Sequence, residues 1–315
     1  MTRRIIHRRF VALGDSFTEG MGDPDPQRPN GVRGWADRVA EQMSAVTPGV
    51  QYANLAIRGK RLEQIVAEQL GPALALRPDL VALFAGVNDL MHLRVRMDEL
   101  MAVYEDVVVK VRATGARVLL FTISDPEPVW IFRPFRGRIA IYNELVRRIA
   151  RRHGATVVDL WDVLDLGDRR LWGDDRLHLA TPGHEIVAGA VCEAIGLEST
   201  VPAEPGPVLV PRGRRHRLAW LARHAFPWFV RRLRGRSLGD GLSPRYPTLT
   251  PPVLSGAGVV GADVTSSLAG CDSAVTSPSA TPSPKASATP TPPAPTGFTD
   301  GPTDVPPPSR STIPS

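Results

Sequence analysis

The residues of this chain that could carry out chemistry start with Gly14-Asp15-Ser16, which directly follows the apolar run 10–13. Glycine permits a sharp turn at the end of a strand, and a serine placed there, ahead of a helix, can expose its hydroxyl as a nucleophile. The same three residues also suit an ordinary turn that ends in a helix N-cap. Because a serine hydroxyl is a weak nucleophile at neutral pH, the catalytic interpretation requires a base and a group that orients the base.

A candidate base and a candidate orienting group lie close together much later in the chain. Asp175 and His178 are three residues apart, on a loop that should lead into a helix. A carboxylate at this spacing can turn back onto one imidazole nitrogen and leave the other free to face Ser16. Asp174 competes with Asp175 for the orienting role, whereas His184 falls inside the following helix and is interpreted as a structural residue.

Attack on a carbonyl group creates an oxyanion, which needs hydrogen-bond donors. The backbone N–H of Ser16 at the start of a helix is one candidate donor, and Gly59 could present a second because it has no side chain in the way. The side-chain amide of Asn88 would be a third, neutral donor. Taken alone, however, Asn88-Asp89 is better interpreted as a loop turn at the end of a strand, and only the other motifs favour a catalytic role.

The alternation of short apolar runs with segments of helical period predicts how these residues would be brought together. Five runs are expected to be strands: 10–13, 52–56, 80–85, 118–122 and 157–160. Apolar residues share a helical face in four segments: Leu62, Ile65, Val66, Leu70; Leu100, Met101, Tyr104, Val107, Val108, Val111; Ile141, Leu145, Val146, Ile149; and Ile186, Val187, Ala190, Val191, Ala194. Such alternation implies an α/β protein with a parallel sheet covered by helices on both faces. Because ligands bind outside the carboxyl ends of such strands, Ser16, Gly59 and Asn88 should converge on one sheet edge.

Four short motifs, in this order and at this spacing, resemble the sequence blocks of the SGNH, or GDSL-type, hydrolases. They are Gly14-Asp15-Ser16, Gly59 after the second strand, Gly86-x-Asn88-Asp89 after the third, and Asp175-x-x-His178. The resemblance covers about residues 10 to 197. Phe17 stands where the family name records a leucine, and it keeps that position apolar.

This resemblance implies a flavodoxin-like three-layer α/β/α sandwich with a parallel five-stranded sheet, and ester hydrolysis through an acyl-enzyme. It also implies a role for each residue. Ser16 would be the nucleophile, His178 the general base and then acid, and Asp175 the group that orients it. The oxyanion hole would consist of the Ser16 N–H, Gly59 and Asn88. The expected substrate is a small-molecule or lipid ester, with an O-acetylated sugar as the alternative.

No cofactor or metal is expected for this reaction. The seven histidines lack cysteine or carboxylate partners at ligand spacing, and no glycine-rich loop ends in the Lys-Ser or Lys-Thr of a nucleotide hydrolase. The two cysteines suggest no disulfide framework, and the apolar run after the N-terminal arginines is too short for a signal peptide. We therefore expect a cytoplasmic protein without a transmembrane segment.

The periodic pattern ends near Leu197, so the expected organisation has three parts. They are a hydrolase domain, 1–197, a linker with an Arg-rich amphipathic segment, 198–252, and a low-complexity tail, 253–315. Within the second part, residues 238–252 are expected to be turn-like. In the tail, 12 of the 40 residues from 276 to 315 are proline and 15 are serine or threonine, so we expect it to be disordered.

The Arg-rich segment, residues 212–236, contains nine arginines and no acidic residue. Its apolar residues fall near helical spacing opposite the arginines, which is typical of a helix lying on an anionic membrane surface. Pro227 interrupts this pattern, which favours instead an extra helix that packs back on the hydrolase with a solvated arginine face, while nucleic-acid binding is a weaker option. A function of another class follows from the first interpretation: a membrane- or partner-binding protein that acts through Arg212 to Arg236.

Overall fold

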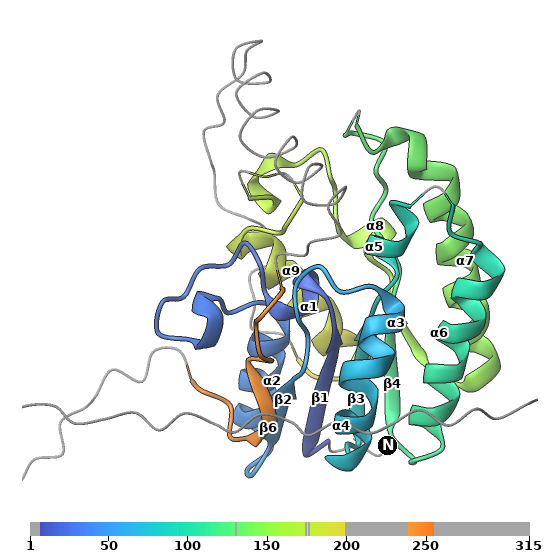
Figure 1. Ribbon diagram of the computed structural model, residues 1–315. Helices are drawn as coiled ribbons and strands as arrows, with labels where there is room; N and C mark the ends of the chain where they lie inside the picture. The colour runs from blue at the N-terminus through green and yellow to red at the C-terminus, as the bar shows by residue number, and fades with distance from the viewer. Residues whose placement is uncertain are drawn as a thin grey trace, which may run out of the picture. The chain divides into compact units, whose positions relative to one another are not determined.

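The computed structural model describes residues 7–92, 94–129, 131–173, 175, 177–198 and 239–254, all within one compact unit that spans residues 1–258. Its parallel strands are β1 (Arg9–Gly14), β2 (Gln51–Asn54), β3 (Leu80–Phe84), β4 (Arg117–Phe121) and β5 (Thr156–Val158). With β6 (Tyr246–Thr250) they form a six-stranded sheet in the order β5-β4-β3-β1-β2-β6 (Figure 1). The five predicted strands are confirmed, because fully buried parallel strands appear in a sequence as unbroken apolar runs.

The sixth strand corrects the prediction of a wholly parallel, five-stranded sheet. β6 runs antiparallel to β2, so the expectation of a turn-like segment at 238–252 is wrong there. Tyr246 pairs with Asn54 and Thr250 with Tyr52, and Pro247 is tolerated because an edge strand has one unpaired side. This strand lies beyond residue 197, where the hydrolase domain was expected to end.

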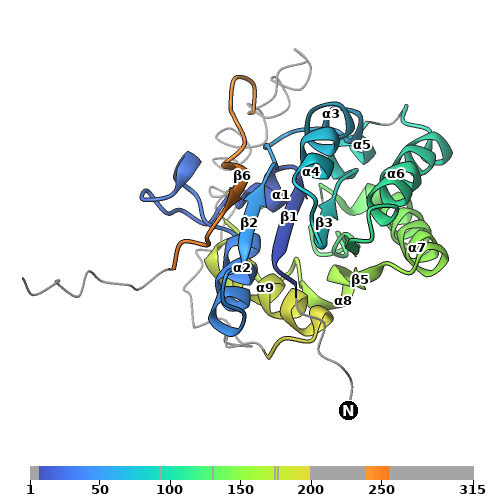
Figure 2. The ribbon, with the colours of Figure 1, turned by 90° about the horizontal axis from the view of Figure 1, so that it is seen from below.

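Helices cover both faces of the sheet (Figure 2). On one face lie α2 (Trp35–Val46) and α9 (Thr181–Ile195), which pack against each other; the other face carries α3 (Leu62–Ile65), α4 (Gly71–Ala75), α6 (Met97–Arg112) and α7 (Arg136–His153). Single turns complete the described elements: α1 (Ser16–Glu19), α5 (Val87–Leu90), α8 (Leu160–Val163), 3-10 turns at Pro29–Gly31, Arg133–Phe135 and Arg169–Leu171, and a π turn at Val66–Leu70. The expected three layers are therefore present.

The helical faces show where the sequence pattern was sufficient. All six apolar residues predicted on one face of α6 are buried. On α7, Val146 and Ile149 are buried as expected, but Ile141 is 58% exposed. Tyr142 and Asn143 turn inward instead, because their side chains bond backbone groups just after β3 and β4. These polar anchors set the rotation of α7, which apolar spacing alone does not reveal.

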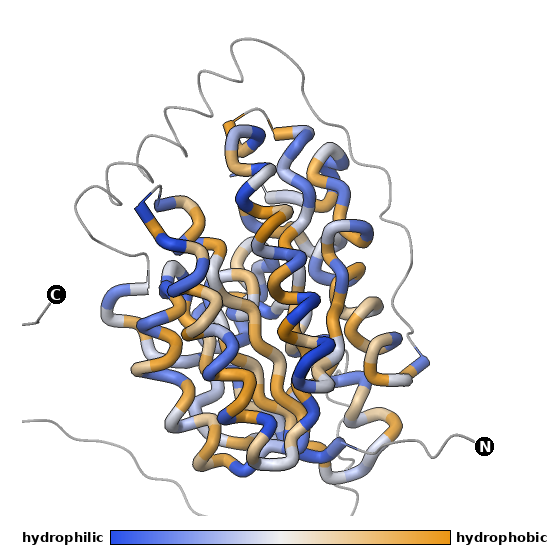
Figure 3. The backbone as a smooth tube through the Cα atoms, turned by 90° about the vertical axis from the view of Figure 1, so that its right-hand side faces the viewer, coloured by the Kyte–Doolittle hydropathy of each residue, from blue (hydrophilic) through white to orange (hydrophobic). Residues whose placement is uncertain are grey.

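Hydrophobic segments run through the middle of the unit, along the strands, whereas the outer helices alternate hydrophobic and hydrophilic residues (Figure 3). None of the helices in the described part of the chain is long and apolar enough to cross a membrane. The predictions for the Arg-rich segment and for most of the tail fall on residues outside those described.

Candidate active site

Ser16 is the first residue of α1, at the carboxyl end of β1. The turn into it depends on Gly14, because a Cβ there would lie 2.6 Å from the carbonyl oxygen of Phe84. The side-chain amide of Gln69 binds both the N–H and the C=O of Gly14, at 2.9 Å each. Asp15 then caps α1 by accepting the N–H of Phe17. A strand, a tight turn and a capped helix therefore hold Ser16 at the edge of the sheet.

Asp175 and His178 meet on the loop before α9, as their spacing predicted. The ring Nδ1 of His178 lies 2.6 Å from Asp175 Oδ2. The other carboxylate oxygen accepts the backbone N–H groups of Leu177 and His178, at 3.0 Å each. Burial raises the pKa of Asp175, but the hydrogen bonds and electrostatic interaction with His178 outweigh it and hold that pKa at about 2. Asp175 is therefore ionised at neutral pH. Asp174 lies outside the described residues.

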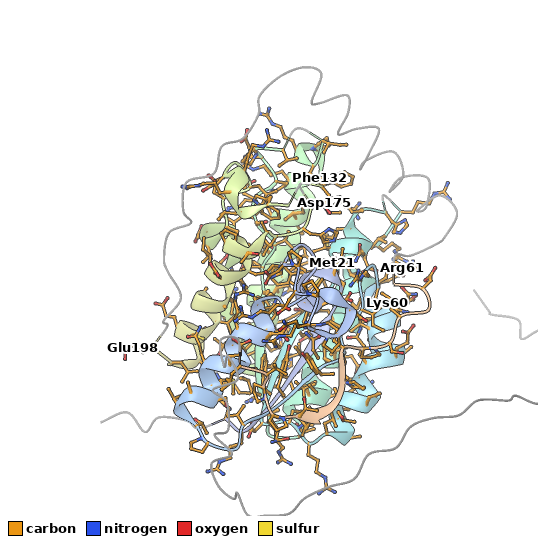
Figure 4. All side chains as sticks on the ribbon, turned by 90° about the vertical axis from the view of Figure 1, so that its left-hand side faces the viewer. Met21, Lys60, Arg61, Phe132, Asp175 and Glu198 are labelled. Atoms are coloured by element: carbon orange, nitrogen blue, oxygen red, sulfur yellow. The ribbon has the colours of Figure 1, made fainter. Side chains whose placement is uncertain are left out.

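Ser16, Gly59, Asn88 and His178 all line one pocket of about 390 Å³. Ser16 follows β1 and Asn88 follows β3, and between these two strands the order of the sheet reverses, which is where ligands bind in open α/β sheets. The predicted convergence at the carboxyl edge is therefore present. Phe132 and Arg61 also line the pocket, and Figure 4 shows these two residues well apart, with Asp175 just below Phe132.

The two other oxyanion-hole candidates lie on separate loops. Gly59 has a φ of +78°, which favours glycine. The amide nitrogen of Asn88 donates to Asp15 Oδ2 at 2.9 Å and to the carbonyl oxygen of Lys60 at 3.1 Å. A substrate oxyanion would have to take the place of one of these acceptors. Burial raises the pKa of Asp15 to about 7, although the Phe17 N–H opposes this, so Asp15 titrates near neutral pH.

A buried ion pair that the sequence does not predict holds the Gly59 loop in place. Glu19, at the end of α1, is completely buried. Its carboxylate accepts from the Arg58 side chain at 2.6 and 2.9 Å and from the Arg58 backbone N–H at 2.7 Å. Nothing in the local sequence signals this pair, since a glutamate that ends a short helix is usually solvated.

His184 supports the site without lining the pocket, in keeping with its interpretation as a structural residue. Its Nδ1 accepts the Trp35 N–H at 3.2 Å, and its Nε2 lies 3.1 Å from the carbonyl oxygen of Met21. Burial lowers the pKa of His184 to about 4, so the ring is neutral, with its proton on Nε2. Nearby, a Cβ on Gly22 would lie 2.1 Å from the Leu179 carbonyl oxygen, so this segment packs tightly against the His178 loop.

Within the described residues, no group of three or more histidine, cysteine, aspartate or glutamate side chains could hold a metal ion. The pocket lining includes the Ser16 hydroxyl, the His178 imidazole backed by the Asp175 carboxylate, and the candidate N–H donors of Gly59 and Asn88. This set suits proton transfer and the stabilisation of a developing negative charge.

The chain resembles known proteins of one family. Residues 12–186 match the model of the GDSL-like lipase/acylhydrolase family. The chain belongs to this family. As a GDSL-like hydrolase, it is a carboxylic ester hydrolase.

Among curated proteins, this GDSL-like hydrolase is similar to an acetylxylan esterase of Geobacillus stearothermophilus, with 25% identity over 212 residues, which cover 60% of this chain and 94% of the relative. Among solved structures, it is similar to the α/β hydrolase LAE5 from the metagenome of Lake Arreo, Spain, with 25% identity, a TM-score of 0.50, and coverage of 60% of this chain and 95% of that one. A catalytic mutant of the acetylxylan esterase Axe2 from Geobacillus stearothermophilus shares the fold, with 24% identity, a TM-score of 0.51 and coverage of 61% and 95%.

Proposed function

We infer that this GDSL-like hydrolase cleaves esters through an acyl-enzyme on Ser16. The observation that supports this most directly is the bond between Asp175 and His178 beside a pocket that both His178 and Ser16 line. With Nδ1–H directed at the Asp175 carboxylate, Nε2 carries the lone pair and can accept a proton. Asp175 also stabilises the imidazolium that forms.

The reaction takes place in two halves. His178 removes the Ser16 proton while Oγ attacks the ester carbonyl carbon, and the resulting oxyanion binds the N–H groups of Ser16 and Gly59 and the amide of Asn88. The C–O bond to the alcohol then breaks, and His178 gives the alcohol its proton. In the second half, water replaces Ser16 Oγ as the nucleophile, and the same steps release the acid and regenerate Ser16.

A fluorophosphonate probe tests the assignment of the nucleophile, because it labels an activated serine covalently. We expect labelling of the wild-type chain and none of Ser16→Ala. Ser124→Ala is the matched control, since Ser124 lines the same pocket but follows β4 rather than β1, and this variant should label as the wild type does. Full labelling of Ser16→Ala, or its loss in Ser124→Ala, would overturn the assignment.

The pocket favours a substrate with an apolar acyl group. Much of its wall is hydrophobic, including Phe84, Val87, Ile123, Leu160, Leu164 and Trp172. Burying one methylene group contributes about 0.8 kcal/mol, so kcat/KM should rise about fourfold for each added carbon until the pocket is full. A series of p-nitrophenyl esters from acetyl to octanoyl measures this increase.

An acetylated sugar is the second candidate substrate, and the similarity to an acetylxylan esterase supports it. This candidate predicts that kcat/KM is highest for acetyl esters and higher on acetylated xylooligosaccharides than on p-nitrophenyl acetate. The same series of esters, together with the acetylated oligosaccharides, therefore separates the two.

A further inference from the structure

The segment 239–254, which we name the C-terminal strap, lies outside the residues 12–186 that the family model matches, yet it reaches the active site. It includes β6 at the edge of the sheet. At its other end, Asp240 lines the pocket together with Gly59. The described part of the active site is therefore made from two stretches of the chain that are far apart in the sequence.

Arg245 anchors the strap to the helix that carries the nucleophile. Its side chain is completely buried and forms a two-pronged ion pair with Asp37, at 2.7 and 3.0 Å. It also donates to the carbonyl oxygens of Pro29, Arg33 and Glu19, at 3.1, 2.8 and 2.8 Å. Because Glu19 ends α1, the last of these bonds joins the strap to the helix that begins with Ser16.

The strap also touches the peptide group that presents the candidate oxyanion donor. A Cβ on Gly239 would lie 2.2 Å from the Arg58 carbonyl oxygen and 2.6 Å from Ile57 Cγ2, so only glycine allows this approach. The Arg58 C=O and the Gly59 N–H belong to the same peptide unit, which is planar. Pressure on that oxygen therefore tilts the N–H at the opposite end. The preceding peptide is held by Glu19, which accepts the Arg58 N–H at 2.7 Å.

We propose that the C-terminal strap is a positioning element of the catalytic site. Gly239 sets the orientation of the Arg58–Gly59 peptide, and Arg245 fixes the strap relative to α1. This proposal rests on the proposed function, because it concerns the oxyanion hole of the Ser16 reaction. It makes turnover depend on a segment that carries neither the nucleophile nor its base.

The test is Gly239→Ala in the full-length chain. The added methyl group displaces the Arg58 carbonyl and turns the Gly59 N–H away, and a misplacement of about 1 Å can lower a rate by about 100-fold. We expect kcat to fall by about that factor, where the concentration of active enzyme is taken from the total labelling of Ser16 by a fluorophosphonate. KM should stay within about twofold of wild type, because the donor acts mainly in the transition state.

Gly115→Ala is the control for lost stability alone. Gly115 has a φ of +84° and open space around the position of a Cβ, so alanine strains the backbone without touching the site. This variant should show a lower Tm and a wild-type kcat. The role of Gly239 is overturned if Gly239→Ala keeps the wild-type kcat. It is also overturned if the two variants have the same Tm and the same loss of kcat.

Arg245→Lys keeps the buried charge, but the lysine cannot reach all four partner residues at once. This variant is the second test of the proposal if Gly239→Ala does not fold. We expect a smaller loss of kcat, again with little change in KM, and a folded Arg245→Lys with wild-type kcat would contradict the anchoring role. The activity of the wild type and its loss in Ser16→Ala are measured alongside. Failure of the strap proposal therefore remains distinct from failure of the Ser16 assignment.

Discussion

A single carboxylate, that of Asp175, holds both the backbone and the ring of His178. Oδ1 accepts the backbone N–H of His178 at 3.0 Å, while Oδ2 lies 2.6 Å from its ring Nδ1. The loop conformation and the orientation of the imidazole therefore depend on the same side chain. A mutation of Asp175 can therefore disturb the loop, the orientation of the imidazole, or both.

Asp175→Asn should keep the loop and lose the catalysis. Oδ1 of the asparagine can still accept the two backbone N–H groups, but its NH2 would face His178 Nδ1 and force the ring proton onto Nε2. In that tautomer His178 cannot accept the proton of Ser16, and kcat should fall by about 10⁴-fold with little change in Tm. Asp175→Ala also loses the hydrogen bonds to the backbone and should therefore lower both kcat and Tm. Comparable kcat values for Asp175→Asn and wild type would exclude Asp175 from the reaction.

Asn88→Ala should lower kcat by about 10² to 10³-fold, because one oxyanion donor is lost, while KM stays close to the wild-type value. Steady-state kinetics on a p-nitrophenyl ester measures both constants. Asn88→Asp should be at least as damaging, since it faces the Asp15 carboxylate that now accepts from the Asn88 amide at 2.9 Å. A rise in KM without a fall in kcat would instead assign Asn88 to ground-state binding.

Glu19→Gln should destabilise the fold as well as slow the reaction. The uncharged side chain leaves Arg58 without its buried counter-ion and turns an NH2 group toward a donor, at a cost of about 3 kcal/mol. Urea denaturation gives the free energy of unfolding. Glu68→Gln is the control, because Glu68 pairs with Lys60 but is 43% exposed, and the loss there should stay below about 1 kcal/mol. Equal losses in the free energy of unfolding for Glu19→Gln and Glu68→Gln would show that burial does not strengthen the Glu19–Arg58 pair.

The buried, neutral His184 should make the fold less stable in mild acid. Its pKa is about 4 in the folded chain but about 6.5 when unfolded, so as the pH falls from 6.5 to 4 only the unfolded state gains a proton. This lowers the free energy of unfolding by up to about 3 kcal/mol. The titratable groups that face His184 are Asp23, Arg38 and His178.

His184→Gln isolates this effect, because glutamine does not titrate. Urea denaturation at several pH values between 7 and 4 should show the stability difference between wild type and variant shrinking as the pH falls. A constant difference across this range would show that His184 does not cause the pH dependence.

The parts of the site that the sequence predicted are local or depend on buried strands. Asp175 and His178 are neighbours on one loop, so their spacing alone brings them together. Ser16 and Asn88 follow strands whose apolar runs are unmistakable, and a parallel sheet places the ends of such strands at one edge.

The missed parts depend on contacts between residues that are distant in sequence. Glu19 and Arg58 are 39 residues apart, and Asp37 and Arg245 are 208 apart. Charged side chains are normally exposed, so neither residue type nor spacing indicates burial. The Arg245 guanidinium is satisfied only once the carbonyl groups of Pro29, Arg33 and Glu19 converge on it, and that convergence is a product of the whole fold. β6 was missed because Pro247 interrupts a strand of only five residues.

The edge position of β6 also sets an order of events during synthesis. When the chain has emerged from the ribosome only as far as residue 197, β2 lacks β6 on its outer side, and Asp37 has Arg28 but lacks its closer partner, Arg245. Both remain so until the strap follows, a delay of several seconds at about 5–20 residues per second. An unpaired strand edge is prone to pairing with other chains, so nascent chains that stop short of residue 239 should aggregate more readily than chains that include the strap.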